Sequence, residues 1–302
     1  MNDRPLVHTP YDGSSKPFTI GLMQLDPDYW IEPDEDLAYH LAEKRRLFAE
    51  HGEQVFRAEP DTADAQQEIL DALCVYLPSH HPAAYCRDGN IMRLAGAELD
   101  LADISIPPLL RAGLLVQDDL VIMRRGEAGW RIAAAFLAFP SSWSLSEKFG
   151  KVMDEVHAPV PDFQGGSRNA GLINRMFDNL SPQRFVERWN WSVNWGYELY
   201  RPAPQPRSET APIPPEGAYL RVERQTLRKM PVSGDILFTI RIYLDPVTAI
   251  SRQPDAPRLA ASLADQLQAM SDAQIDYKGL TEKRAELVDL LRQIAGNPVE
   301  AE

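Results

Sequence analysis

One histidine stands where its imidazole could bind the metal of a cofactor. The pattern from Leu145 to His157 predicts a helix whose apolar stripe includes Phe149 and Met153, with His157 at the edge of that stripe. Gly150 lies on nearly the same line, so a flat group could approach the helix there without meeting a side chain. Because neutral histidine binds iron and a porphyrin needs an apolar slot, this arrangement suits an axial haem ligand. It also suits a histidine that only interacts with a helix end, and spacing alone leaves both interpretations open.

The strand expected before this helix has unusually small side chains for a sheet core. Its small positions are Ala133, Ala134, Ala135 and Ala138. Since protein interiors are close-packed, small walls leave volume that another group must fill. We therefore expect space for a ligand next to this strand.

A second group of metal-binding residue types lies between positions 74 and 86. Its members are Cys74, His80, His81 and Cys86. Structural zinc sites favour closely spaced ligand pairs on turns, whereas Cys74 is expected in the middle of a helix. We therefore favour a buried free thiol and exposed loop histidines over a zinc site.

Several catalytic motifs are missing. The sequence has no glycine-rich nucleotide-binding motif, no Gly-x-Ser-x-Gly motif of α/β-hydrolases and no Cys-x-x-Cys-His motif for covalent haem attachment. A reductive oxygenase built on this chain would therefore need electrons from another protein.

The composition excludes further classes of protein. The chain has 302 residues, 31 Lys and Arg against 44 Asp and Glu, a formal net charge of -13 and two cysteines. An acidic chain is a poor nucleic-acid binder, because phosphate contacts need clustered Lys and Arg. The longest nearly uncharged apolar run, Ile132 to Phe139, is too short to span a bilayer. With no secretory signal visible at its start, we expect a cytoplasmic protein without a membrane partner.

Local patterns predict the elements that position these residues. Residues 1–33 read as an irregular arm with aromatic anchors, followed by helices over about 34–58 and 62–76, the second stopped by Pro78. Residues 91–108 are expected to be a loop or short turns. A hairpin with strands over 119–125 and 130–139 turns between Gly126 and Gly129.

Helices then interrupt the strands. A capping box at Ser144 and Glu147 begins the helix that reaches His157, a second helix covers 170–180, and Ser181-Pro182 begins a short third one. Strands return over 191–200, 219–230 and 236–244, with a proline-rich loop from Arg201 to Glu216 between the first two. Helices over about 256–270 and 282–295 follow, the last ended by Gly296 and Pro298.

This order predicts an α+β fold. We expect an antiparallel sheet with helices on one face, as in the PAS fold, plus helical N- and C-terminal extensions. Residues 1–110 would be an N-terminal arm and helices packing on the core, residues 111–250 the PAS-like core that binds the ligand, and residues 251–302 a C-terminal helical extension, all in one compact unit.

Six motifs between residues 139 and 243 carry a resemblance to a known family. They are Phe139-Pro140-Ser141-Ser142-Trp143, Glu147-Lys148-Phe149-Gly150, Val156-His157-Ala158-Pro159-Val160-Pro161, Arg188-Trp189-Asn190-Trp191, the run from Leu220 to Leu227 and the run from Phe238 to Tyr243. Together they resemble the haem-dependent oxidative N-demethylase alpha-subunit family. The similarity extends over about residues 20–246.

The resemblance implies an oxidoreductase with a PAS-like domain that holds haem b, with His157 as the axial iron ligand. It implies a monooxygenase that removes an N-methyl group from a small secondary amine such as dimethylamine, giving formaldehyde and the demethylated amine. The partners would be the amine, O2 and an electron-transfer reductase subunit with flavin and iron–sulfur centres. Because neither cysteine falls in the matched region around His157, a His-ligated haem is favoured over a thiolate-ligated one.

The matched motifs also supply candidates for contacts with the cofactor. Anionic haem propionates need Arg or Lys, for which the candidates are Lys148, Arg224 and Arg241. Cross-strand ion pairs involving Arg221, Glu223, Arg224 and Arg241 would explain the same residues equally well. Pocket walls could come from Trp143, Phe149, Gly150, Met153, Trp191 and Trp195, although a buried tryptophan is usually only part of a core.

The substrate leaves weaker signals. A protonated amine needs a hydrogen-bond acceptor or an aromatic face, and the catalytic candidates are Asp178, Tyr197 and Glu198. A PAS-like haem sensor or redox module without turnover is the alternative function, and a relative that has lost haem is the third. The lack of an appended kinase, cyclase or DNA-binding unit favours the enzyme.

Overall fold

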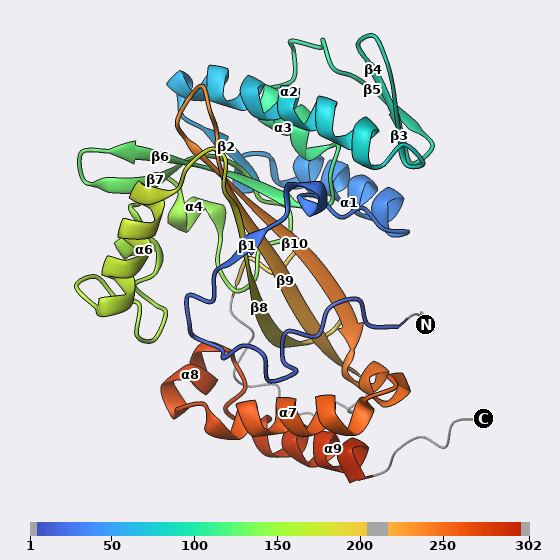
Figure 1. The fold of residues 1–302 in the computed structure, drawn as a ribbon, viewed down its shortest axis with the longest axis vertical. Coiled ribbons are helices and arrows are strands. Elements are labelled where there is room, and N and C mark those ends of the chain that lie inside the picture. Colours follow the sequence, from blue (N-terminus) through green and yellow to red (C-terminus); the bar gives the residue numbers. More distant parts are fainter. Residues whose placement is uncertain (1–4, 204–216, 297–302) are drawn as a thin grey trace.

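The main feature of the fold is an antiparallel sheet of seven strands (Figure 1). The computed structural model describes residues 5–203 and 217–296. Across the sheet the strands are β1 (Met23–Leu25), β8 (Phe185–Trp195), β9 (Ala218–Lys229), β10 (Ile236–Pro246), β6 (Asp119–Gly126), β7 (Gly129–Phe136) and β2 (Phe56–Ala58). A separate three-stranded sheet contains β3 (Tyr85–Asp88), β4 (Ile91–Leu94) and β5 (Ala97–Asp100). The predicted α+β class is confirmed.

Helices surround the large sheet. They are α1 (Leu37–His51), α2 (Ala63–His80), α3 (Pro108–Gly113), α4 (Leu145–Lys148), α5 (Met153–Val156), α6 (Arg168–Asn179), α7 (Ala256–Ala269), α8 (Asp272–Tyr277) and α9 (Arg284–Gly296). In Figure 1, α1 to α3 lie at one end of the long strands and α7 to α9 at the other. No helix within residues 5–203 and 217–296 combines the length and the apolar character needed to span a membrane.

A β-bulge in β7 explains how helices cover both faces of the sheet. Ala134 pairs with Ile122 and Ile132 pairs with Met123, so Ala133 has no partner and the side chains on its two sides point to opposite faces. Phe136 packs on one face against Gly113 of α3. Trp130 packs on the other face against Phe177 of α6, with ring centroids 5.8 Å apart. The predicted arrangement with helices on a single face is therefore wrong.

The five strands predicted for the core all form, and their order confirms the predicted hairpin. β6 and β7 pair through the turn from Gly126 to Gly129, and β6 then pairs with β10. The strand predicted over 191–200 begins and ends earlier, at Phe185 and Trp195. The predicted proline-rich loop from Arg201 to Glu216 lies outside the described residues from 204 onward, as does Pro298.

Three local predictions are wrong. The helix expected over 34–58 ends at His51, and Phe56–Ala58 is a strand that pairs with β7. Pro78 does not stop α2 but lies in its last turn. Because proline has no N–H, it cannot donate to the Cys74 carbonyl four residues earlier, and the Arg87 guanidinium lies 3.5 Å from that carbonyl instead. Ser181-Pro182 begins a turn and no helix.

The segment from Ile91 to Pro108, predicted as a loop, contains two strands. β3 and β4 are joined by the two-residue turn Gly89-Asn90, with Gly89 at φ +58°. β4 and β5 are joined at Ala95 and Gly96, both with positive φ. Such turns match the twist of a hairpin, but alanine rarely adopts this conformation, so the second turn has no clear signal in the sequence.

The C-terminal helices form a second core with the lower parts of β8 to β10. Leu259, Leu263 and Leu267 of α7 belong to one buried cluster with Trp191 and Tyr243 of the sheet. The division into residues 1–110, 111–250 and 251–302 stays a prediction, although β1 and β2 of the first part are strands of the large sheet.

A pair of helical glycines offers a matched test of this packing. A methyl group at Gly113 would lie 2.3 Å from Cδ1 of Phe136, whereas one at Gly171 of α6 would meet only the flexible Arg175 side chain at 3.7 Å. We expect Gly113→Ala to lower the free energy of unfolding by about 1–3 kcal/mol through overpacking. Gly171→Ala should raise it by about 0.5–1 kcal/mol. Urea unfolding of both variants checks this, and equal effects would contradict the packing described.

Candidate functional site

His157 follows a break in the helix that was predicted to carry it. The capping box at Ser144 and Glu147 forms as predicted, but α4 ends at Lys148. Gly150 then takes φ +76°, a left-handed conformation that favours glycine, and its N–H donates to the Ile132 carbonyl at 2.9 Å. α5 starts again at Met153, and His157 ends it. The single helix from Leu145 to His157, and the alignment of Gly150 with His157 on it, are therefore wrong.

One hydrogen bond fixes the tautomer of His157. Its Nδ1 lies 3.1 Å from the Met153 carbonyl oxygen, which can only accept, so Nδ1 carries the proton. The Nε2 atom then holds the lone pair, and it makes no hydrogen bond with any residue in the described part of the chain. A ring held by Nδ1–H to a backbone carbonyl, with Nε2 free, is the usual state of a metal-binding histidine.

The surroundings keep this imidazole neutral. Burial, with the positive charges of Arg188 and Lys148 nearby, lowers the pKa of His157 to about 4. The Lys148 ammonium donates to the carbonyl of Val156, beside His157. A neutral ring is the form that binds a metal ion.

Arg188 is a cationic neighbour of His157 to which the sequence analysis gave no role. Burial lowers its pKa, and its Nε is buried without a hydrogen-bond partner, while Nη2 donates to the Thr19 carbonyl at 3.2 Å. Arg221 of β9 has the same feature: its Nε makes no hydrogen bond and lies 3.6 Å from Glu223. Side chains alternate along β8 and β9, so Arg188, Arg221 and Glu223 share one face of the sheet, which we call the His157 face.

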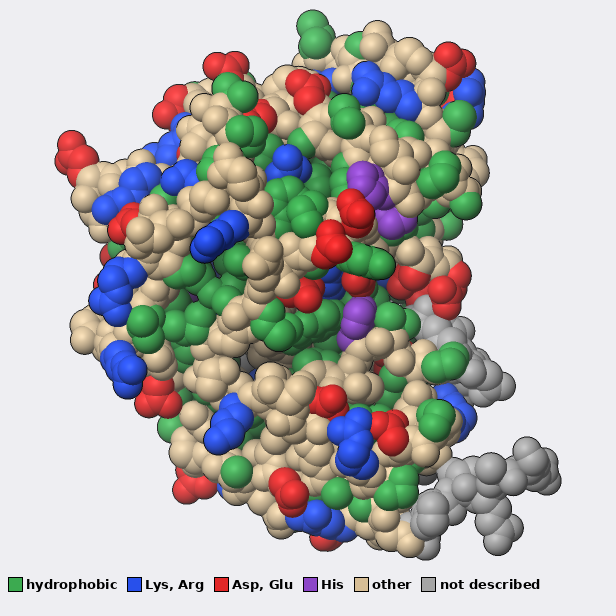
Figure 2. All heavy atoms as spheres, in the orientation of Figure 1, with side chains coloured by type: hydrophobic (Ala, Val, Ile, Leu, Met, Phe, Trp, Pro, Cys, Tyr) green, Lys and Arg blue, Asp and Glu red, His purple; other side chains and the backbone are tan. Residues whose placement is uncertain are grey.

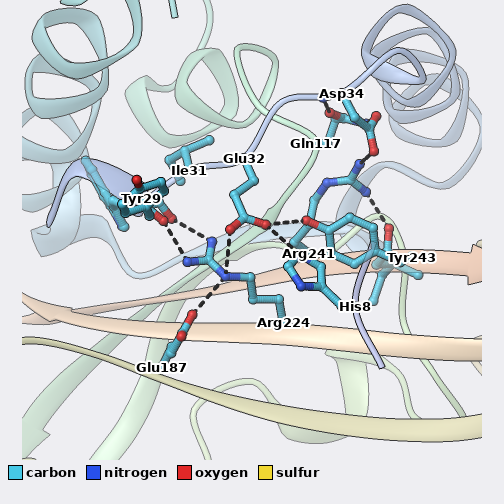
Figure 3. A network of polar contacts seen from close by, with 12 residues as sticks. His8, Tyr29, Ile31, Glu32, Asp34, Gln117, Glu187, Arg224, Arg241 and Tyr243 are labelled. Atoms are coloured by element: carbon cyan, nitrogen blue, oxygen red, sulfur yellow. Dashed lines mark hydrogen bonds and ion pairs between the residues drawn. The ribbon is translucent and has the colours of Figure 1, made fainter. Parts of the chain in front are cut away.

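Arg224 and Arg241 lie on the opposite face, which we call the arm face (Figure 3). Arg224 pairs with Glu187 at 2.9 Å and donates to the Tyr29 carbonyl at 2.6 Å, and Arg241 pairs with Asp34. The structure does not bring these arginines together with His157. Their contacts agree with the ion-pair interpretation of the two residues, whereas Lys148 does lie beside His157.

The predicted walls are divided in the same way. Met153 holds the imidazole, and Trp143 and Phe149 are half-buried against the main core. Trp191 belongs to the second core beside Tyr11, with Trp195 packed against it. The four alanines are fully buried within the protein, and Ala133 accepts a hydrogen bond from the Glu59 N–H. The space beside Gly150, by contrast, is open: a Cβ there would meet no atom within 4 Å.

The three substrate candidates do not meet. Asp178 lines a cavity of about 210 Å³ with Met153, Asp154 and Trp130, and accepts a 2.9 Å hydrogen bond from the Trp130 indole. Tyr197 lines a separate space of about 10 Å³, enough for one water molecule at most. Glu198 is 70% exposed and lies 3.4 Å from Arg201.

The cysteines and histidines near position 80 have other contacts. Cys74 is a buried free thiol and Cys86 is exposed. His80 stacks on Tyr76 at 4.0 Å between ring centroids, and His81 contacts the Ile31 carbonyl at 2.8 Å. In the described ranges, no three His, Cys, Asp or Glu side chains are grouped so that they could hold a metal ion.

Comparison with protein families gives one match. The model described as haem-dependent oxidative N-demethylase, alpha subunit-like, matches residues 21–288. The chain belongs to this family. The resemblance seen in the motifs is thereby confirmed, and the chain is an enzyme of the oxygenase type that depends on haem and works with a partner subunit.

The residues around His157 fit such a cofactor. The lone pair on Nε2 is available to a metal ion, and the buried Nε of Arg188 is a charged donor without an acceptor in the described part of the chain. A haem propionate would give that donor its missing acceptor. The open side of Gly150 leaves room next to the segment that carries His157.

Sequence reasoning missed Arg188, Glu223 and Lys278 as members of this region. Arg188 belongs to the motif Arg188-Trp189-Asn190-Trp191 and follows Glu187 in the sequence. This neighbouring pair of opposite charges was the one local indication that Arg188 has a role. Lys278 follows α8, donates to the Trp191 carbonyl and lies over the Phe18 and Trp191 rings, 5.1 and 4.9 Å from their centroids. Nothing in its local sequence indicates these contacts.

Lys278 should make stability depend on pH. Burial lowers its pKa to about 8, opposed by the charge of Glu223. In the unfolded chain the lysine stays protonated to about pH 10.4, so between these values the unfolded state binds more protons and stability rises with pH. We expect the wild type to gain up to about 3 kcal/mol of unfolding free energy, relative to Lys278→Met, from about pH 8 to about pH 10.5. Replacing the exposed Lys16 by Met is the control. If the unfolding free energy of all three proteins changed in parallel with pH, Lys278 would not have the lowered pKa.

Proposed function

We propose that this chain is the haem-binding, oxygen-activating subunit of an enzyme that removes an N-methyl group from a small secondary amine such as dimethylamine. The products would be formaldehyde and the demethylated amine. Family membership supports the reaction class, and the half-buried, neutral His157 with its free Nε2 is the observation that carries the assignment of the iron ligand. When bound, haem b would supply the activation of oxygen that oxidising an N-methyl group requires.

The residues of the chain have defined tasks in this proposal. The Met153 carbonyl holds the His157 ring through Nδ1, which leaves Nε2 as the atom that would bind the iron. Arg188 and Lys148 place positive charge next to the imidazole, where anionic propionates are stabilised. The sheet from β8 to β10 with the β6–β7 hairpin forms the PAS-like core that supports these groups.

Among the substrate candidates, Asp178 has the best surroundings. Its cavity of about 210 Å³ is lined by two carboxylates, Asp154 and Asp178, by the indole of Trp130 and by Arg125, which lies 3.2 Å from Asp178. Carboxylates and aromatic faces are the groups that hold a protonated amine. We therefore assign Asp178 to amine binding ahead of Tyr197 and Glu198.

Haem titration tests the ligand. Protein purified without haem and titrated with haemin should give the Soret band of a His-ligated b-type haem. His157→Ala should weaken haem binding by at least about tenfold and change the spectrum, because the only iron ligand assigned is lost. Added imidazole should restore the wild-type spectrum of the variant. His51→Ala, which removes a histidine that stacks on Tyr200, is the matched control. An unaltered spectrum in His157→Ala would show that another group binds the iron.

Turnover tests the reaction. With dimethylamine, oxygen and an electron donor, the haem-loaded protein should release formaldehyde and methylamine in equal amounts. Asp178→Asn should raise KM for the amine by about tenfold with little change in the haem spectrum, since it removes a carboxylate charge from the amine site and leaves Arg125 there without its partner. Reversible oxygen binding without formaldehyde from any secondary amine would favour the sensor or redox module instead.

A further inference from the structure

We propose that the outer surface of α6 is the docking site for an acidic electron-transfer protein that serves this chain. The inference rests on the proposed function, because only a reductive oxygenase needs such a donor. The charge of this acidic chain is unevenly distributed along the sequence.

The segment from residue 145 to residue 188 carries no net charge. It contains six Lys and Arg and six Asp and Glu, so the other residues hold the whole net charge of -13. Its basic residues are Lys148, Lys151, Arg168, Arg175, Arg184 and Arg188. None of the six forms an ion pair with any residue of the described chain, although most arginines elsewhere do.

Arginines outside the segment neutralise two of its acidic residues. Asp178 lies 3.2 Å from Arg125, and Glu187 pairs with Arg224 on the arm face. Within the described residues the other four, Glu147, Asp154, Glu155 and Asp162, form no ion pair, and Asp154 accepts from the neutral Asn174. The segment therefore has six unpaired cations against four unpaired carboxylates, a small excess of positive charge.

α6 presents these cations outward. Its buried side packs Ala170, Ile173 and Phe177 on the core. Arg168, Leu172 and Arg175 follow one another along the opposite stripe at helical spacing, and both arginines are exposed. Lys151 before α5 and Arg184 after α6 are exposed as well. Figure 2 shows Lys and Arg side chains along the side of the molecule where Figure 1 places α6.

The position of this surface favours an electron donor. α5, which ends at His157, contacts α6, and the Asp154 carboxylate of α5 accepts from Asn174 of α6 at 3.0 Å. Electron transfer slows steeply with distance, and a donor that docks on α6 would lie close to the segment that carries His157. Exposed cations steer an anionic partner to that side and leave the rest of the chain, at -13, to repel it.

A protein fits this surface better than a nucleic acid. The patch has only four exposed cations, and half-buried Leu172 and Met176 lie among them. Apolar contacts between charged groups are typical of protein interfaces, whereas duplex binding needs many phosphate contacts.

Binding of a plant-type [2Fe–2S] ferredoxin, an acidic donor, to the full haem-free chain tests the proposal. Affinity should fall steeply as salt is raised, and Arg168→Glu/Arg175→Glu should weaken binding at low salt by at least about tenfold. A glutamate at the start of α6 also suits the helix dipole, so folding should be retained, which circular dichroism checks. Lys16→Glu/Arg45→Glu makes the same change in charge at exposed sites elsewhere and should alter binding by less than about twofold.

Equal loss of ferredoxin binding in both double variants, or none in either, overturns the docking site. Duplex DNA that binds the wild type as tightly as ferredoxin does also overturns it. If ferredoxin binding depends on α6 but haemin does not bind the chain, the proposed function fails while the docking surface stands. If haemin binds through His157 and α6 does not matter, the reverse holds.

Discussion

Two arginines buried side by side in the sheet determine where the N-terminal arm must lie. Arg224 and Arg241 are directly paired across β9 and β10, and each is 1% exposed. Buried cations are tolerated only when carboxylates and hydrogen bonds replace the lost water. Glu32 and Asp34 of the arm supply these, and Glu32 also accepts from Tyr243 at 2.7 Å (Figure 3). The same contacts fix the start of α1, because Asp34 binds Gln117, which contacts His40.

The sequence indicated the arm but not the reason for its position. Aromatic anchoring was predicted, and Tyr11 and Trp30 are indeed fully buried, whereas Tyr29 is 64% exposed. The carboxylates were not recognised, because their partners are about 190 to 210 residues away and no local pattern links them. Elements determined by nearby residues were predicted well: the β6–β7 hairpin and the capping box at Ser144 both form. Gly89-Asn90 was an available hairpin signal for β3 and β4 that was not used.

In the candidate site, too, features that depend on nearby residues were predictable from the sequence, whereas features that depend on distant residues were not. A motif and a predicted helix both pointed to His157. The helix is not continuous, because Gly150 takes a left-handed conformation and its N–H donates to the Ile132 carbonyl of β7. That break depends on the neighbouring strand, which a helical wheel ignores. Choosing among Lys148, Arg224 and Arg241 required knowing which face of the sheet each strand residue occupies. Arg188, which precedes Trp189 in the same motif, lies on the His157 face.

The carboxylates of the N-terminal arm make the two faces of the sheet chemically different. The arm supplies the carboxylates of Glu32 and Asp34 to the arm face, so Arg224 and Arg241 are neutralised by the protein itself. Buried Nε atoms without a hydrogen bond occur on both faces, in Arg188 and Arg221 on the His157 face and in Arg228 and Arg241 on the arm face. Glu223 lies 3.6 Å from Arg221 and also accepts from Asn190 and Gln225, whereas Arg188 forms no ion pair within the described residues. A buried donor without an acceptor costs stability in the isolated chain, and an anionic ligand would remove that cost by binding. The neutral His157, whose Nε2 is free, lies near Arg188, so these two features together suit a cofactor that carries both a metal and negative charge.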